Sequence, residues 1–99
     1  MLKIDKTITD ENTTIILEGR LDTVTSRDLE ATLKDLLPGT TNLIFDFTKL
    51  DYVSSAGLRV LLSAHKTMLK QGEMKLIHVS PEIMDIFEVT GFSDILTIE

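Results

Sequence analysis

The stretch that decides the fold of this chain is Asp51-Tyr52-Val53-Ser54-Ser55-Ala56-Gly57-Leu58-Arg59-Val60-Leu61-Leu62. It follows an apolar run typical of a β-strand and opens an amphipathic run typical of a helix, so its two serines occupy a strand-to-helix turn. The first turn of a helix has free backbone N–H groups and the positive end of the helix dipole. Because negative charge is favoured there, this turn suits a phosphate better than any other part of the sequence.

Strands are predicted on both sides of that stretch, where apolar residues alternate with polar ones or run together. These runs cover residues 2–8, 13–17, 43–47, 74–79 and 95–98. The first two are separated by the turn sequence Asp10-Glu11-Asn12 and are expected to pair antiparallel. The third is apolar almost throughout, which is typical of a central strand covered on both faces.

Three helices are predicted from apolar stripes, over residues 25–37, 55–71 and from Pro81 up to Gly91. Thr25 with Asp28 resembles a capping box, and Pro38-Gly39 ends the first helix. Gly72 fits the C′ position of the second, and Ser80-Pro81 supplies an N-cap and a first-turn proline for the third. The stripes expected to be buried are Leu29, Leu33, Leu36 and Leu37; Leu58, Leu61, Leu62, His65, Met68 and Leu69; and Ile83, Ile86 and Phe87.

The predicted order of elements is therefore β-β-α-β-α-β-α-β, which belongs to the α/β class. Strands separated by helices are expected to pair in parallel through right-handed crossovers, giving a mixed sheet with helices packed against it. A chain of 99 residues is expected to form one domain, residues 1–99, and its hydrophobic content of 42% is ordinary for a globular protein.

The formal net charge is −6, from 16 acidic and 10 basic residues. This balance argues against direct binding of nucleic acid, which needs a basic surface. The charged residues of 59–75 are nevertheless mostly basic, whereas residues 76–99 contain no Lys or Arg. Two solvated helix faces explain this pattern simply, and an acidic surface that meets a basic partner is the alternative.

The sequence contains no Cys, which excludes disulfides and thiolate chemistry. No apolar run approaches the roughly 18 residues of a membrane span. The first residues also lack the apolar segment of a signal peptide. We therefore expect a soluble, cytoplasmic protein that makes no contact with a membrane.

Most catalytic motifs are absent. There is no P-loop and no Gly-x-Gly-x-x-Gly sequence, and His65 and His78 are not spaced as a metal pair, so neither a cofactor nor a metal site is predicted. A nucleophilic Ser55 with either histidine as its base stays open as an alternative, although no Gly-x-Ser-x-Gly motif supports it.

Three carboxylates are predicted at strand ends or turns, where Asp usually forms a turn or caps a helix: Asp22, Asp46 and Asp51. If crossovers bring the ends of neighbouring parallel strands together, Asp22 and Asp51 are expected near Ser55. The resulting polar surface at one edge of the sheet would suit docking as well as catalysis.

Three segments, taken with the order of elements, resemble a known family: Leu17-Glu18-Gly19-Arg20-Leu21-Asp22, Val53 to Leu62, and Val89-Thr90-Gly91-Phe92 to Ile95. They resemble the STAS domain family, and within it the stand-alone anti-sigma factor antagonists of bacteria. The resemblance implies a switch by partner exchange. The unphosphorylated protein would bind an anti-sigma factor, itself a serine kinase with a histidine-kinase-like ATPase fold, and so free a sigma factor. Phosphorylation by that kinase would separate the two proteins, and a phosphatase would reset them.

The resemblance also implies which residues form the site. The usual motif of the family is Asp-Ser-Ser/Thr-Gly, with the first hydroxyl residue modified, and alignment on Gly57 places that position at Ser55. Ser54 replaces the usual Asp and is the alternative acceptor, while Ala56 replaces the second hydroxyl. Asp22 matches an acidic residue of the family's partner surface. The predicted partner-binding residues are Asp22, Ser54, Ser55, Ala56, Gly57 and Arg59.

Other interpretations of the same turn remain open. Ser54 or Ser55 can simply cap the second helix, which is worth about 1 kcal/mol. A STAS subunit that acts constitutively in a transporter-associated or stress-sensing complex needs no modified serine, and weak nucleotide binding at the helix N-terminus is a further option. Whichever applies, Gly57→Val is expected to damage the turn and the close approach of the second helix.

Overall fold

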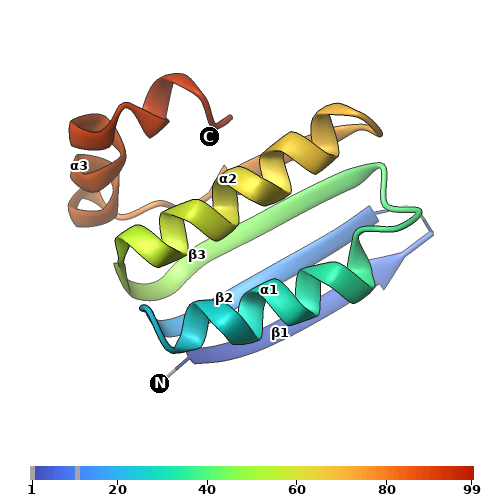
Figure 1. Ribbon diagram of the computed structural model, residues 1–99, viewed down its shortest axis with the longest axis horizontal. Coiled ribbons are helices and arrows are strands. Elements are labelled where there is room, and N and C mark those ends of the chain that lie inside the picture. Colours follow the sequence, from blue (N-terminus) through green and yellow to red (C-terminus); the bar gives the residue numbers. More distant parts are fainter. Residues whose placement is uncertain (1, 11) are drawn as a thin grey trace.

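A computed structural model describes residues 2–10 and 12–99 and has α/β architecture (Figure 1). Its elements are β1 (Leu2–Thr9), β2 (Asn12–Leu21), α1 (Thr25–Leu36), β3 (Asn42–Val53), α2 (Ser55–Leu69), β4 (Glu73–Ile77), α3 (Pro81–Thr90) and a 3₁₀ turn, η1 (Phe92–Asp94). The first seven follow the predicted order. Of the predicted turn between β1 and β2, Glu11 lies outside the described residues, and Asp10 has a left-handed backbone.

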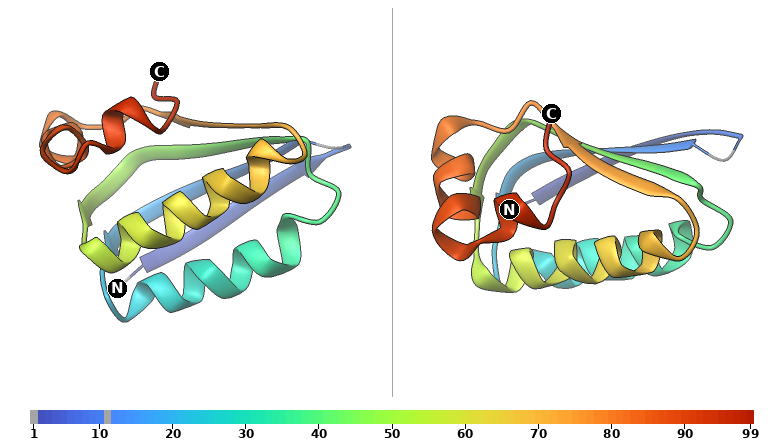
Figure 2. Two further views of the ribbon diagram at one scale, coloured as in Figure 1. Left: turned by 45° about the horizontal axis from the view of Figure 1, so that its top comes forward. Right: turned by 90° about the horizontal axis from the view of Figure 1, so that it is seen from above.

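The four strands form one mixed sheet in the order β1-β2-β3-β4. β1 pairs antiparallel with β2, whereas β2, β3 and β4 are parallel. The two crossover helices, α1 and α2, lie side by side along the same face of the sheet (Figures 1 and 2). The register places Leu21 opposite Val53, so β2 and β3 end at the same edge, where both crossover helices begin.

The core lies between the sheet and the helices. The buried strand side chains that face it include Ile15, Leu17, Leu43, Phe45, Phe47 and Leu76. Phe47 also packs against Phe87, with ring centroids 6.4 Å apart, which holds α3 on the core. The predicted stripes of α1 and α3 face this core, with one member of each only half-buried. In α2 the stripe is shifted, because Val60 and Ala64 are buried whereas Leu69, predicted to be buried, is 69% exposed.

The prediction of a last strand over residues 95–98 is wrong. After α3 the chain turns through η1, and of residues 95–98 only Ile98 pairs with the sheet, in one isolated parallel bridge to Leu76. The Leu76 N–H donates to the Thr97 carbonyl oxygen and the Glu99 N–H donates to the Leu76 carbonyl oxygen, each at 2.9 Å. These two bonds tie the end of the chain to β4 without forming a regular ladder.

The structure also changes how two helix ends are explained. The predicted capping box of Thr25 with Asp28 does not form. Thr25 is instead the second member of a reciprocal pair with Asp22, in which the Thr25 N–H donates to Asp22 Oδ1 and the Asp22 N–H donates to Thr25 Oγ1, each at 2.9 Å. Gly72 does not have the left-handed backbone expected of a C′ residue. Glycine is required there because a Cβ would lie 1.8 Å from the Thr41 carbonyl oxygen. The ends of α3 are as predicted, with Ser80 as N-cap and Gly91 left-handed at a φ of 82°.

Candidate functional site

Two strand ends meet where the sequence places the site. β2 ends at Leu21 and β3 at Val53, and the Ser54 N–H donates to the Leu21 carbonyl oxygen at 2.8 Å. This bond joins the two chain segments just before their helices begin, and it brings Asp22 together with the serine turn. Asp51 lies within β3, before its last two residues, and its side chain is exposed.

The two serines have different environments. Ser54 is the N-cap of α2, because its hydroxyl accepts a hydrogen bond from the Gly57 N–H at 3.2 Å and its carbonyl accepts one from the Leu58 N–H at 2.9 Å. Ser55 is the first helical residue, and its exposed side chain makes no hydrogen bond with any described residue. The Ser55 hydroxyl is therefore available for modification, whereas that of Ser54 is engaged in capping.

Asp22 caps the start of α1. Its Oδ1 accepts hydrogen bonds from the N–H groups of Val24 and Thr25, at 3.0 and 2.9 Å, and its carbonyl accepts one from the Ser26 N–H at 2.9 Å. The Thr25 hydroxyl accepts a hydrogen bond from the Asp22 N–H at 2.9 Å and donates one to the Arg20 carbonyl oxygen at 2.7 Å. Hydrogen bonding, above all from the Thr25 N–H, holds the pKa of Asp22 below its ordinary value. An ionised carboxylate thus stands beside the serine turn at neutral pH.

Gly57 lets α2 approach the end of β2. Its φ is not left-handed, so the requirement for glycine is one of space. A Cβ at this position would lie 2.7 Å from the Leu21 Cγ and 3.1 Å from the Leu21 carbonyl oxygen. Because Leu21 is fully buried and its carbonyl oxygen accepts the bond from Ser54, this contact sets the position of the serine turn.

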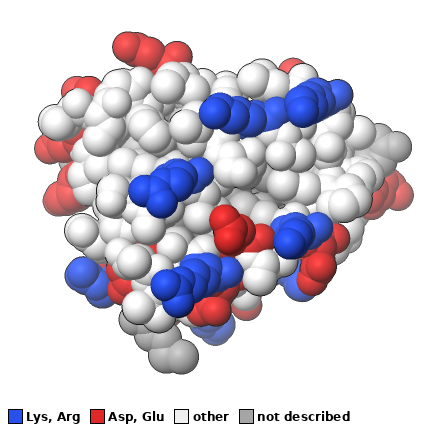
Figure 3. Space-filling view, in the orientation of Figure 1, with Lys and Arg blue, Asp and Glu red and all other residues white. Residues whose placement is uncertain are grey.

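Arg59 and Ala56 line one end of a groove between α1 and α2, together with Arg27. Arg59 lies one helical turn after Ser55 and forms no ion pair with any described residue. Figure 3 shows Lys and Arg side chains over the face formed by α1 and α2, with several Asp and Glu side chains between them, and further Asp and Glu side chains toward α3.

Sequence analysis missed three exposed residues beside the site. The Arg20 guanidinium stacks on the Tyr52 ring, 4.3 Å from its centroid, and Val24 is 72% exposed at the start of α1. Arg20 pairs with Tyr52 in the sheet directly before Leu21 and Val53, so the stack lies at the same edge. Tyr and Arg are frequent in binding hot spots. The available signal was a tyrosine just before the turn in a chain that is only 5% aromatic.

Neither histidine is placed to activate Ser55. His65 follows ten residues later on the same helix, roughly 15 Å away at the usual rise per residue. His78 follows β4, which ends opposite Asp46, and the seven residues from there to the end of β3 span roughly 23 Å. At that place His78 Nδ1 lies 3.1 Å from Asp46 Oδ1. A hydrolase with Ser55 as nucleophile and either histidine as its base is therefore contradicted.

In residues 2–10 and 12–99, no group of three or more His, Asp or Glu side chains is arranged to hold a metal ion. No helix in those residues is long and apolar enough to cross a membrane.

Comparison with known proteins assigns the chain to a family, since a family model for the STAS domain matches residues 3–99. The chain belongs to the STAS domain family. This STAS domain is 36% identical over 84 residues to BtrV of Bordetella bronchiseptica, a candidate anti-sigma factor antagonist, and the match covers 83% of this chain and 72% of BtrV. It is 28% identical over 97 residues to the anti-sigma-B factor antagonist of Staphylococcus aureus, covering 96% of this chain and 90% of that protein.

Solved structures have the same fold as this STAS domain. The Bacillus anti-sigma factor antagonist SpoIIAA superposes with TM-scores of 0.77 and 0.75 in its unphosphorylated and phosphorylated forms, at 20% identity, covering all of this chain and 87% and 91% of those chains. An anti-sigma factor antagonist from Mycobacterium paratuberculosis gives 0.89 at 17% identity, covering 99% and 85%. These likenesses confirm the predicted α/β STAS fold.

Proposed function

We propose that this STAS domain is a cytoplasmic anti-sigma factor antagonist that is switched by phosphorylation of Ser55. In its unmodified form it binds an anti-sigma factor, a serine kinase with the histidine-kinase-like ATPase fold, and thereby frees a sigma factor. The single observation that carries the proposal is the free, exposed hydroxyl of Ser55 at the first position of α2. The names of its relatives, and the existence of SpoIIAA in a phosphorylated form, support the same assignment.

A phosphate on Ser55 is compatible with the fold. It carries a charge of about −1.5 to −2, and a helix N-terminus favours that charge. The cap of α2 is made by Ser54, so modification of Ser55 removes no hydrogen bond from it. Arg59, one turn later and without an ion-pair partner among the described residues, is placed to pair with the phosphate.

The effect of modification therefore falls on the partner. The ionised Asp22 and the exposed Tyr52, Val24 and Arg20 surround the serine turn and form the proposed contact surface. A dianion placed in the middle of a packed interface loses water and opposes any acidic group of the partner. A loss of about 3 kcal/mol of binding free energy would weaken affinity more than a hundredfold. A phosphatase would then restore binding.

The test compares three variants with the wild-type protein, using partners captured from extracts of the host and then purified. Ser55→Asp should have the same melting temperature as wild type, and its Kd for the anti-sigma kinase should be more than a hundredfold higher. Ser55→Ala should bind that kinase and resist phosphorylation, whereas the control Ser54→Ala should still be phosphorylated. Full phosphorylation of Ser55→Ala would instead make Ser54 or another residue the acceptor.

A different outcome of the same capture would reject the switch. If wild type and Ser55→Asp retain the same membrane or transporter subunits, Ser55 has no switching role. The chain would then be a constitutive subunit of a larger complex.

A further inference from the structure

The groove between α1 and α2 continues well beyond the serine turn. The part that extends to Thr67 has a volume of about 490 Å³. It is continuous with the part near Ala56, because Arg27, Glu30, Val60 and Ser63 line both. Thr67 follows Ala56 by eleven positions along α2, so the groove is roughly 16 Å long at the usual helical rise. That length matches about three turns of another helix.

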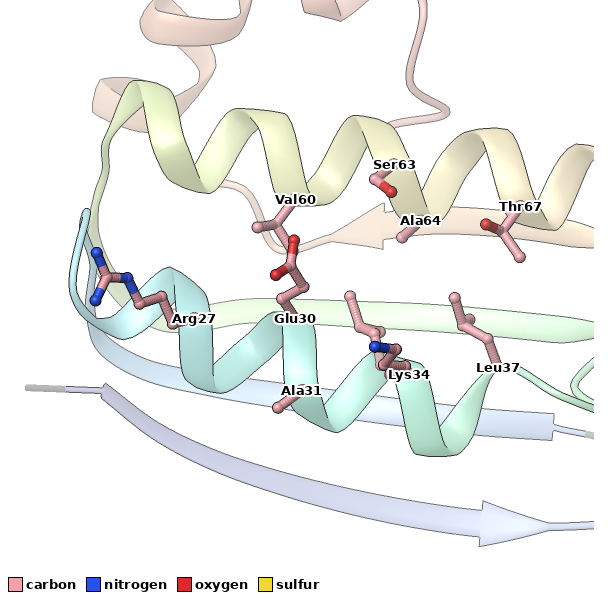
Figure 4. A pocket seen from close by; sticks show the side chains of 10 residues that line it. Arg27, Glu30, Ala31, Lys34, Leu37, Val60, Ser63, Ala64 and Thr67 are labelled. Carbon is pink, nitrogen blue, oxygen red and sulfur yellow. The ribbon is translucent and has the colours of Figure 1, made fainter.

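The floor of this groove is apolar. Leu33, Val60 and Ala64 are almost completely buried and line it from both helices. Figure 4 shows Val60 and Ala64 on α2 directed toward the space that faces α1. A helix laid in such a groove packs its apolar stripe against the floor at an interaxial distance of about 8 to 10 Å.

The rim of the groove is charged and unpaired. Arg27 and Lys34 stand on α1 and Arg59 on α2, and Glu30 is the one acidic residue among the described lining residues. None of these four side chains forms an ion pair with any described residue. Three free cations around an apolar floor, in a chain whose net charge is −6, are complementary to an amphipathic helix flanked by Asp or Glu.

We propose that this groove, lined by Arg27, Lys34, Arg59, Val60 and Ala64, docks an acidic amphipathic helix of the anti-sigma factor. The identity of the partner rests on the proposed function. The new element is the segment of the partner that docks in the groove. Its apolar residues contact the floor, and its carboxylates pair with the rim. A concave groove with only three cations fits a helix better than it fits the flat, anionic surface of a membrane.

The experiment measures Kd between the full chain and each purified anti-sigma kinase of the host, at low and at high salt. The charge-reversal variant Arg27→Glu/Lys34→Glu should bind at least tenfold more weakly and lose most of the salt dependence. The matched control Lys6→Glu/Lys70→Glu makes the same change in net charge, on β1 and at the end of α2, with two lysines that also form no ion pair with any described residue, and should stay within twofold of wild type. Ser63→Trp, at an exposed position that lines the groove, should weaken binding by filling the groove without any change in charge.

The outcomes separate this proposal from the proposed function. If Ser55→Asp loses the kinase while both groove variants bind as wild type does, the groove is not the docking site and the antagonist function stands. If wild type binds no anti-sigma kinase, the proposed function itself fails. If light scattering shows that the wild-type chain self-associates and that Arg27→Glu/Lys34→Glu does not, the occupant of the groove is a second copy of the chain, bound through its acidic α3. If the wild-type chain binds anionic vesicles and the same variant does not, the occupant is a membrane surface. Either result overturns the proposal.

Discussion

Replacing Gly57 by alanine should destabilise the fold, although alanine is the better helix former. The intrinsic preference for alanine in a helix is at most about 1 kcal/mol. Against it stands a Cβ that would lie 2.7 Å from the Leu21 Cγ and 3.1 Å from the Leu21 carbonyl oxygen. Overpacking of a buried site costs about 1 to 3 kcal/mol, so we expect a net loss of up to about 2 kcal/mol for alanine and more for valine.

The clash cannot be relieved locally. Leu21 is fully buried, and its Cγ is a branch point inside the core rather than the mobile end of a side chain. Movement of its backbone would lengthen the 2.8 Å bond from the Ser54 N–H that joins the ends of β2 and β3. Thermal unfolding should therefore show a decrease in Tm of up to roughly 16 °C for Gly57→Ala.

A double-mutant cycle with Leu21→Ala tests the cause. Leu21→Ala alone should cost about 2 to 5 kcal/mol, because it leaves a cavity beside α2. In that background Gly57→Ala should cost much less than in wild type, since the clashing Cγ is gone and only the 3.1 Å contact with the carbonyl oxygen of residue 21 remains. A higher Tm for Gly57→Ala alone would refute the reasoning. So would a double variant whose loss of stability equals the sum of the two single losses within about 0.5 kcal/mol.

Three further changes test the ends of the helices. Asp22→Asn should lower Tm at pH 7. Because the pKa of Asp22 is lower in the folded state than its ordinary value of 3.8, its negative charge stabilises the fold at pH values above 3.8. This stabilisation is lost as pH falls through the folded-state pKa. The difference in Tm between wild type and Asp22→Asn should therefore close below pH 3.8 and not stay constant. Gly72→Ala should cost about 3 kcal/mol of stability, since its Cβ would overlap the Thr41 carbonyl oxygen. The control Ser63→Ala, at an exposed position, should change Tm by no more than about 2 °C, and an equally small change for Gly72→Ala would contradict the prediction. Ser54→Ala should cost about 1 kcal/mol in denaturant unfolding through loss of the α2 cap, and an unchanged midpoint would contradict that role.

The elements that sequence predicted well are those with a local physical signal. Ser80 and Pro81 begin α3, and left-handed Gly91 ends it, because these residue types suit helix ends wherever they occur. The meeting of Asp22 with the serine turn followed from the parallel order of β2 and β3, since parallel strands end at a common edge.

The errors arose where tertiary contacts override local pattern. β3 runs to Val53 rather than stopping at Phe47, because its polar second half still pairs with β2 across shifts in register. Residues 95–98 have an apolar pattern, yet η1 leaves only Ile98 in position to bridge to β4. Gly72 was recognised as a helix-ending residue, but the carbonyl that excludes any side chain belongs to Thr41, 31 positions earlier. Neither that contact nor the groove between α1 and α2 has a signature in the local sequence.

The geometry also explains how one small group could control a large surface. Ser54 already caps α2 and Asp22 caps α1, so a phosphate on Ser55 would have no structural bond to replace. It would act through charge instead, and the nearest cation along α2 is Arg59, which also lines the proposed docking groove. Pairing of that arginine with the phosphate would reduce the positive charge offered to an acidic helix while the dianion repels the same helix. Both effects oppose binding without requiring the fold to move, which is the behaviour that a partner switch on a rigid domain needs.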